Sequence, residues 1–127
     1  FLIYKYGDDV RLVESYYELR YLRDTTGSSQ AIVLKPYNVS SNSRITLYNG
    51  QLAADSYLSF KNTGAVNLQI FTSNDPNASV PPNVTEILVG ETKDGIYADI
   101  LSDGNGFNWL IVVNANGIDG TVEIGKE

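Results

Sequence analysis

Apolar and polar residues alternate along most of the chain, and this period of two predicts β-strands. Within residues 65–71, Val66, Leu68 and Ile70 share one face, and the two residues between them are polar. The same alternation recurs at Ile45 and Leu47, Leu58 and Phe60, Ile87 and Val89, Ile96, Ala98 and Ile100, and Val122 and Ile124. The segment 107–113 is apolar on both faces, which is typical of a central strand.

Turns rich in Gly and Asn separate these runs and indicate the fold class. Asn62-Thr63-Gly64 joins two alternating runs, and similar turns lie at residues 103–106 and 116–120. A succession of about eight short strands punctuated by such turns is typical of an all-β protein. We therefore expect a single antiparallel β-sandwich or jelly roll, with an extension strand at its N-terminus.

Residues 10–24 are the one stretch that also fits a helix. At helical spacing Val13, Tyr17 and Tyr21 line up, but two glutamates would then repel each other four residues apart. At strand spacing the apolar and aromatic residues share a face, and Tyr and Val favour strands. The pattern leaves both alternatives open, and we expect a strand.

Composition narrows the classes of function. The chain has 127 residues, enough for one domain with its own core, and contains no Cys, His or Met. The lack of Cys and His removes the usual zinc, copper and iron ligands and the catalytic groups based on these residues. We expect a protein that is not an enzyme and needs no cofactor. Because no apolar run is long enough to span a bilayer, we also expect no membrane insertion.

The formal charge of −6 is concentrated in the second half of the chain. Residues 1–61 contain seven Lys or Arg and six Asp or Glu, a net charge of +1, whereas residues 62–127 contain two and nine, a net charge of −7. An acidic chain binds nucleic acid poorly, because phosphate neutralisation supplies most of that affinity. The asymmetry suits head-to-tail contact between copies as well as plain solubility.

The first six residues, FLIYKY, are unusually apolar, and the missing initial Met fits a processed terminus or a fragment. They fit an ordinary first strand of the sandwich or a connector strand that completes another copy's sheet edge. An exposed strand so low in charge would aggregate unless something covered it. We expect a connector and hinge in residues 1–9 and a sandwich in residues 10–127. The expected subunit-interface residues are Phe1, Leu2, Ile3, Tyr4, Lys5 and Tyr6, and the expected hinge residues are Gly7, Asp8 and Asp9.

Two kinds of surface modification or ligand site are suggested by short motifs. Sequons begin at Asn38, Asn77 and Asn83 and are candidate N-glycosylation sites, although chance yields a similar number in a chain this rich in Asn, Ser and Thr. Asp103-Gly104-Asn105-Gly106 faintly resembles a calcium loop. The full loop pattern with its terminal Glu is absent, and a simple turn explains these residues as well.

Nine tyrosines and a single tryptophan supply much of the aromatic surface. Seven of the tyrosines lie within the first 48 residues, where acidic side chains balance the basic ones. This favours sheet packing or a protein interface over a platform for single-stranded nucleic acid. Trp109 and solvent-facing tyrosines would suit a carbohydrate-binding surface, but the doubly apolar strand around Trp109 favours a core position.

The segments FKNTGAVNLQIFTSNDP and VTEILVGETKDGIYADI, with the final strand GTVEIGKE, resemble the small jelly-roll subunits of extracellular fibres. These include endospore-appendage-type and archaeal bundling-pilus subunits, and phage decoration and tail proteins share the same turns. The resemblance covers about residues 56–125 and implies residues 1–6 as a connector strand with residues 7–9 as its hinge. Spore-appendage subunits also carry cysteines that link neighbours, and this chain has none.

These observations together predict a structural subunit of an extracellular or cell-surface, pilus-like filament. Its partners would be identical subunits joined by donation of the N-terminal strand, held by strand pairing and apolar burial alone. A virion decoration or tail protein is one alternative, and a secreted carbohydrate-binding module is another. The same stable sandwich would serve all three, so the sequence leaves them open.

Overall fold

The structure, a computed structural model, describes residues 2–6, 8–26 and 32–127, and the chain forms two compact units. The N-terminal unit comprises Phe1–Ile32 together with Glu127, and the sandwich comprises Val33–Lys126. Among the described residues, no helix has the length and apolar character needed to cross a membrane.

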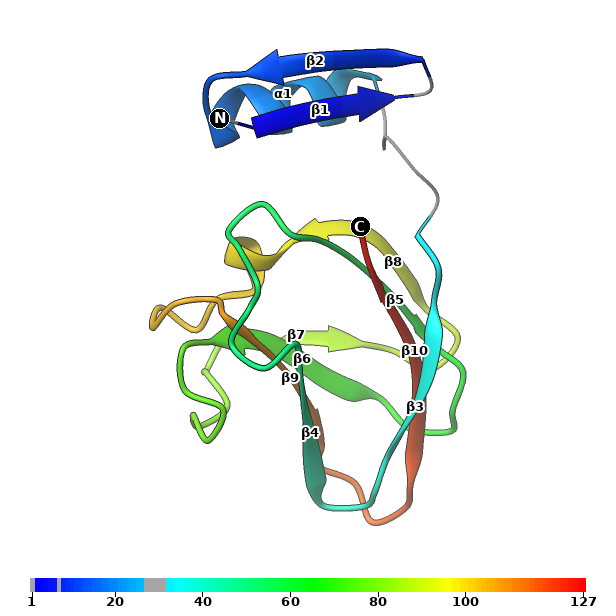
Figure 1. Ribbon diagram of the computed structural model, residues 1–127. Helices are drawn as coiled ribbons and strands as arrows, with labels where there is room; N and C mark the ends of the chain where they lie inside the picture. Colours follow the sequence, from blue (N-terminus) through cyan, green and yellow to red (C-terminus); the bar gives the residue numbers. More distant parts are fainter. Residues whose placement is uncertain (1, 7, 27–31) are drawn as a thin grey trace. The chain divides into compact units, whose positions relative to one another are not determined.

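The sandwich consists of two four-stranded antiparallel sheets, which confirms the predicted fold class (Figure 1). The β10 sheet has the order β3-β10-β5-β8, and the β9 sheet has the order β4-β9-β6-β7. Its strands are β3 (Lys35–Val39), β4 (Ser43–Leu47), β5 (Tyr57–Asn62), β6 (Leu68–Ser73), β7 (Thr85–Ile87), β8 (Thr92–Tyr97), β9 (Trp109–Asn114) and β10 (Gly120–Lys126). Strand β9 lies between β4 and β6, so the doubly apolar segment forms a central strand as predicted.

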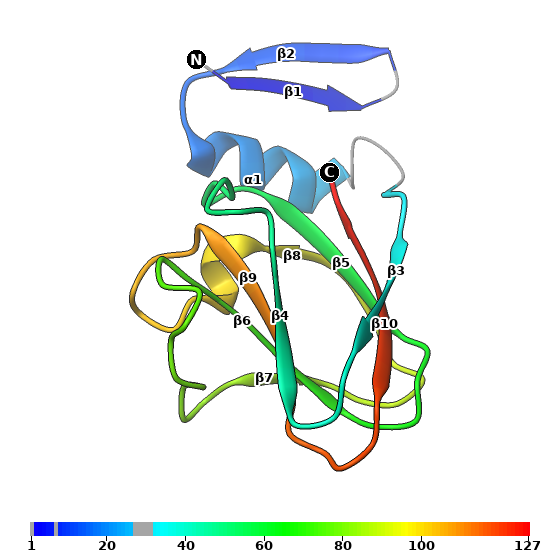
Figure 2. The same ribbon diagram turned by 60° about the horizontal axis from the view of Figure 1, so that its bottom comes forward.

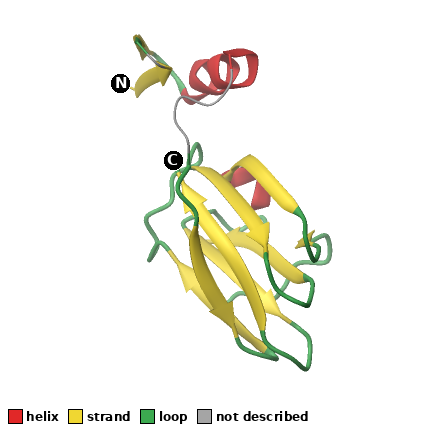
Figure 3. Cartoon of the chain, turned by 90° about the vertical axis from the view of Figure 1, so that its right-hand side faces the viewer, coloured by secondary structure: helices red, strands yellow, loops and turns green. Residues whose placement is uncertain are grey.

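The alternation predicted through Ile100 ends earlier than expected. Strand β8 stops at Tyr97, and the 3-10 helix η1 (Ala98–Leu101) follows, seen as the short red coil of the sandwich in Figure 3. Ala98 and Leu101, three residues apart, are buried, whereas Ile100 is exposed. The period of three places these residues on one side of the turn, which a strand would not do.

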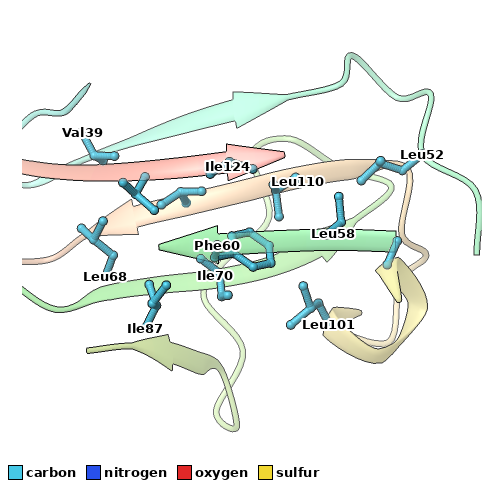
Figure 4. Packing of buried hydrophobic residues seen from close by; sticks show 13 residues of the cluster. Val39, Leu52, Leu58, Phe60, Leu68, Ile70, Ile87, Leu101, Leu110 and Ile124 are labelled. Atoms are coloured by element: carbon cyan, nitrogen blue, oxygen red, sulfur yellow. The ribbon is translucent and has the colours of Figure 1, made fainter. Parts of the chain in front are cut away.

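The core lies between the two sheets and is built by the inward-facing residues of both (Figure 4). Phe60 on β5 and Ile70 on β6 come from opposite sheets, and both are fully buried. The cluster contains Val39, Leu52, Leu58, Phe60, Leu68, Ile70, Ile87, Ala98, Leu101, Leu110, Val112, Val122 and Ile124. All of these residues belong to the sandwich, so this unit has a complete core of its own.

Two buried asparagines connect the sheets. Asn62, at the end of β5, donates from Nδ2 to the carbonyl oxygen of Ile87 on β7 at 3.0 Å. Asn114, at the end of β9, donates from Nδ2 to the carbonyl oxygen of Val39 on β3 at 2.9 Å. The Asn62 bond runs from β5 in the β10 sheet to β7 in the β9 sheet. The Asn114 bond runs from β9 in the β9 sheet to β3 in the β10 sheet, so both bonds connect the two sheets. Bonds from buried side chains fix the register of the sheets as well as stabilising them.

The loop that follows β6 is bonded to β4 at the opposite edge of the β9 sheet. Arg44 on β4 donates from Nη1 to the carbonyl oxygens of Pro76 and Ala78, at 3.2 and 2.7 Å.

Phe71 and Ile111 are register partners on β6 and β9, and both are buried although neither belongs to the inter-sheet core. By strand alternation their side chains point to the outer face of the β9 sheet.

The N-terminal unit is a two-stranded antiparallel hairpin with one helix on it. Strand β1 (Leu2–Tyr6) pairs with β2 (Asp9–Val13), and the helix α1 (Tyr16–Thr26) follows (Figure 2). Tyr4, Val13 and Leu19 are buried together, with Leu22 packed against them. One face of the hairpin is therefore covered by the helix.

The expectation of a strand over residues 10–24 holds for residues 10–13, which lie in β2, and is corrected from Tyr16 onward, where α1 begins. The backbone N–H of Glu18 donates to Ser15 Oγ at 3.2 Å, and the N–H of Glu14 donates to Glu18 Oε2 at 2.9 Å. Ser15 is the N-cap, so Glu14 precedes the helix and the expected repulsion with Glu18 does not act within it. The sequence Ser15-Tyr16-Tyr17-Glu18 is a capping-box signature, and it ends the strand after Val13.

The division between the two units lies at Ile32, not after Asp9 as expected. The reason is that residues 2–6 find their strand partner within residues 9–13 of the same chain. Asp9 is the first residue of β2, and Asp8 is an exposed turn residue between the two strands, so these two residues of the predicted hinge lie within the hairpin. Gly7 and Phe1 lie outside the described residues.

Candidate interaction surface

The face of the hairpin that the helix does not cover carries three exposed aliphatic residues. Ile3, Val10 and Leu12 are 58%, 60% and 68% exposed, and we call these three residues the hairpin face. Ile3 and Leu12 are register partners, and Val10 lies two residues from Leu12 on the same strand, so the three are neighbours. Single exposed aliphatic residues are ordinary, but an apolar face shared by two strands indicates an interaction surface.

The backbone of the hairpin is also available for pairing. Among the described residues, β1 has β2 as its one strand neighbour, and β2 has β1. Each strand therefore has one edge without a strand beside it. Open edges are templates for further pairing, and natural proteins usually protect them.

The residues expected to form the connector differ in their burial. Residues 2–6 form β1, and Ile3 is on the exposed face while Tyr4 is buried against the helix. Tyr4 packs in the core of its own unit, whereas Ile3 is the exposed member of the pair.

A second exposed apolar group lies at one end of the sandwich. Leu88 and Val89, in the turn between β7 and β8, are 47% and 51% exposed, and Ile118, in the turn between β9 and β10, is 57% exposed. We call these three residues the turn-end surface. Alternation predicted Val89 on the same strand face as Ile87, but strand β7 ends at Ile87 and leaves Val89 in the turn.

Hydrogen bonds to Asn67, in the turn between β5 and β6, connect the two parts of this surface. The N–H of Val89 donates to Asn67 Oδ1 at 2.9 Å, and Asn116 Nδ2 donates to the carbonyl oxygen of Asn67 at 3.0 Å. Asn114 Nδ2 also donates to the carbonyl oxygen of Ile118 at 2.8 Å. The turns that carry Val89 and Ile118 are therefore linked through one residue between β5 and β6.

Glu91 fixes the conformation of the Leu88 turn. Its Oε1 accepts a hydrogen bond from the N–H of Leu88 at 2.9 Å, and its Oε2 lies 3.4 Å from Lys93 Nζ. The hydrogen bond from the Leu88 backbone and the nearby Lys93 lower the pKa of Glu91 against the smaller opposing effect of desolvation.

A small cavity opens on the sandwich between the end of the long loop and η1. Its volume is about 270 Å³, and its lining includes Phe71, Pro81, Val84, Ile100 and Asp103. Phe71 is almost fully buried, so its ring offers little surface on which a sugar could stack. The cavity gives no specific support to a carbohydrate site.

The predicted glycosylation sequons lie at exposed positions, and the predicted calcium motif forms a local turn. Asn38, Asn77 and Asn83 are all exposed, on β3 and in the long loop, so the sequons remain candidates. Asp103 Oδ1 accepts the N–H of Asn105 at 2.7 Å, which is a local turn bond. Among the described residues there is no group of three or more acidic side chains that could hold a metal ion.

Trp109 differs from the expectation of a core position. It is half-buried, lies outside the inter-sheet core, and alternates with inward-facing Leu110 along β9. Gly50, with φ +76°, packs on the indole so closely that an added Cβ would lie 3.2 Å from Trp109 Nε1. The indole is therefore partly covered by the chain itself.

No protein family and no curated protein matches the chain in sequence. A solved structure, the crystal structure of PirA, is similar with a TM-score of 0.51 and 15% identity, over 77% of this chain and 96% of PirA. At this identity the likeness concerns the fold alone, and it agrees with the sandwich described above.

Proposed function

We propose that the protein is a self-assembling structural subunit of an extracellular or cell-surface filament, in which the N-terminal unit joins one copy to the next. The observation that carries this proposal is the hairpin face, an exposed apolar surface on a two-stranded sheet with two open edges. The fibre-subunit resemblance of residues 56–125 supports the same reading.

A hairpin of this kind gains stability from a partner. Two-stranded sheets are marginal in water unless a third strand or another layer covers them, and the helix covers one face here. Burial of the other face on a second copy would remove Ile3, Val10 and Leu12 from water. If that contact joins different surfaces of the two copies, it repeats and builds a fibre.

The connector in this proposal is the whole hairpin and not β1 alone. Strand β1 is paired with β2 along all five of its residues, and Tyr4 is buried in the core of the unit. Donation of β1 by itself would break that pairing and expose Tyr4. Docking of the hairpin face keeps both.

The test compares the full chain with residues 33–127, which retain the complete inter-sheet core. We expect the full chain to form filaments in negative-stain electron microscopy and the shorter chain to remain a folded monomer in light scattering. Leu12→Asp in the full chain should also prevent assembly, because it places a charge in the hairpin face. Ile100→Asp is the matched control, an exposed aliphatic residue of the sandwich. A full chain that stays monomeric over a wide concentration range would contradict the proposal.

A further inference from the structure

We propose that Asn49 is a site of spontaneous deamidation, the reaction that converts an asparagine followed by glycine into aspartate and isoaspartate. Three Asn-Gly pairs occur in the chain, at residues 49–50, 105–106 and 116–117, and all of them lie between strands of the sandwich. Glycine favours the reaction because it carries no side chain that would obstruct its attacking backbone nitrogen. The inference does not depend on the proposed function, since the reaction takes place within one subunit.

The reaction needs water as its one co-reactant. The backbone nitrogen of Gly50 attacks Cγ of Asn49, and the side-chain amide takes up the proton of that nitrogen and leaves as ammonia. A five-membered succinimide ring now joins the two residues. Water opens the ring at either of its two carbonyl carbons and gives aspartate or isoaspartate. In isoaspartate the main chain runs through Cβ and Cγ and is longer by one carbon atom.

Asn49 and Gly50 are the central residues of a turn that follows β4. Their φ angles are +47° and +76°, as in a type I′ turn, and the N–H of Gln51 donates to the carbonyl oxygen of Tyr48 at 2.8 Å. Asn49 is exposed, and within residues 2–6, 8–26 and 32–127 its side chain has no hydrogen-bond partner. In this turn Cβ of the first central residue points away from the next nitrogen, so the turn opens before the ring can close.

The backbone before this pair is strained, which favours opening. Tyr48 has φ +70°, so three consecutive residues occupy the left-handed region. A tyrosine is disfavoured there because its Cβ approaches the following carbonyl oxygen. Release of this strain offsets part of the free energy that is lost with the hydrogen bond between Gln51 and Tyr48.

Asn116 is protected by hydrogen bonds on both its side chain and its backbone. Its Nδ2 donates to the carbonyl oxygen of Asn67 at 3.0 Å and to Asn114 Oδ1 at 3.1 Å. Its N–H donates to the same Asn114 oxygen at 2.9 Å, and its carbonyl oxygen accepts the N–H of Asn42 at 3.0 Å. The amide nitrogen that would leave as ammonia is therefore held in place.

Asn105 has a free side-chain position but a fixed backbone. Its N–H donates to Asp103 Oδ1 at 2.7 Å, and its carbonyl oxygen accepts the N–H of Asn74 at 2.6 Å. Gly106 packs so closely on the Asn74 side chain that no Cβ would fit, and its carbonyl oxygen accepts Ser102 Oγ at 2.6 Å. The peptide between Asn105 and Gly106 cannot rotate without breaking these contacts, so Asn49 is the pair with least protection.

The experiment incubates the full chain in warm, mildly alkaline buffer and follows each Asn-Gly peptide by mass spectrometry, with chromatography to separate the two products. We expect Asn49 to react at least about tenfold faster than Asn105 and Asn116, because two further hydrogen bonds of ordinary strength slow the reaction by about that factor. The same chain in concentrated urea is the control. There the three pairs should react at similar rates, since the protecting bonds are lost.

Two results would overturn the inference. One is a folded chain in which Asn105 or Asn116 reacts as fast as Asn49, and the other is a folded chain in which Asn49 stays intact while the urea sample reacts. Both measurements use dispersed subunits. A chain that never assembles would therefore contradict the proposed function and leave this inference standing.

Trp109 provides a second measurement. A Cβ added to Gly50 would lie 3.2 Å from Trp109 Nε1, so the turn packs directly on the single indole of the chain. A turn lengthened by isoaspartate cannot keep this packing, and the tryptophan fluorescence should shift to longer wavelength in step with the loss of Asn49. Asn49→Gln is the matched control, because it keeps an amide but would need a six-membered ring, which forms far more slowly. An equal spectral drift in that variant would contradict the link between the indole and Asn49.

Discussion

The two units of this chain differ in how completely each buries its own apolar residues. The sandwich buries thirteen residues in one cluster between two sheets, and its buried asparagines bond across that core. In the described part of the N-terminal unit the corresponding cluster is Tyr4, Val13 and Leu19, with Leu22 beside it. Two four-stranded sheets that share one large core can stand alone, whereas a two-stranded sheet with a small core depends on what covers its other face.

The strongest test of this difference is to remove a large side chain from each core. Phe60→Ala should lower the free energy of unfolding of the sandwich by about 3–5 kcal/mol, because the side chain is fully buried. Tyr4→Ala should abolish the structure of the N-terminal unit and leave the sandwich transition unchanged. Thermal unfolding followed by near-ultraviolet and far-ultraviolet circular dichroism measures both. Equal shifts of the sandwich transition in the two variants would show that the units unfold as one.

The asparagines provide the next largest effect. Asn114→Ala leaves the buried carbonyl of Val39 without its side-chain donor, so we expect a loss of about 1–3 kcal/mol in the free energy of unfolding. Asn38→Ala, at an exposed position one residue before Val39, is the control and should change the stability by less than about 0.5 kcal/mol. Urea unfolding measures both values. If the two variants are equally stable, the bond between the sheets contributes little.

A smaller effect is expected at the start of the helix. Ser15→Ala removes the side-chain acceptor of the Glu18 N–H and should destabilise α1 by about 1 kcal/mol. Ser15→Asp should retain the cap and the stability. Hydrogen exchange of the helix amides reads the N-terminal unit separately from the sandwich. If the helix amides are equally protected in both variants, the Ser15 cap is not the reason why the strand stops at Val13.

The last effect is confined to alkaline pH and to the sandwich. Burial, with a further contribution from Tyr37, raises the pKa of Tyr48 to about 12. Between about pH 10, where an unfolded tyrosine ionises, and about pH 12, the unfolded chain has released this proton and the folded chain still holds it. Stability should therefore fall as the pH rises through that window. Tyr48→Phe should flatten the fall in alkaline urea titrations, whereas exposed Tyr17→Phe should leave it unchanged.

The sequence was most informative where structure is periodic. Alternation predicted the sandwich and the central position of β9, because inward and outward positions repeat every two residues in a strand. It failed over residues 16–24, which belong to α1, because tyrosines suit a strand and a helix alike. The capping residues Ser15 and Glu18 were the available signal, and they indicate a helix start regardless of the aromatic residues around them.

The candidate surfaces could be predicted only in part, and the reason is sequence separation. FLIYKY drew attention to the N-terminus, but the covered and bare faces depend on where the helix packs. The turn-end surface joins Val89 and Ile118 through Asn67 and Asn116, which are 49 positions apart. A single sequence without long-range pairing information does not reveal such neighbours, because each turn by itself is an ordinary Asn- and Gly-containing turn.

The antiparallel register of β3 and β10 has a mechanical consequence. The N-terminal unit is attached at the Lys35 end of β3, and the turn-end surface lies beyond the Val39 end. If the N-terminal unit and the turn-end surface were pulled in opposite directions, tension would enter at one end of this strand and leave near the other, so the load would run along the strand axis. The hydrogen bonds between β3 and β10 are roughly perpendicular to that axis and would be sheared together instead of being unzipped one after another. A subunit loaded in this direction resists extension with its whole ladder at once.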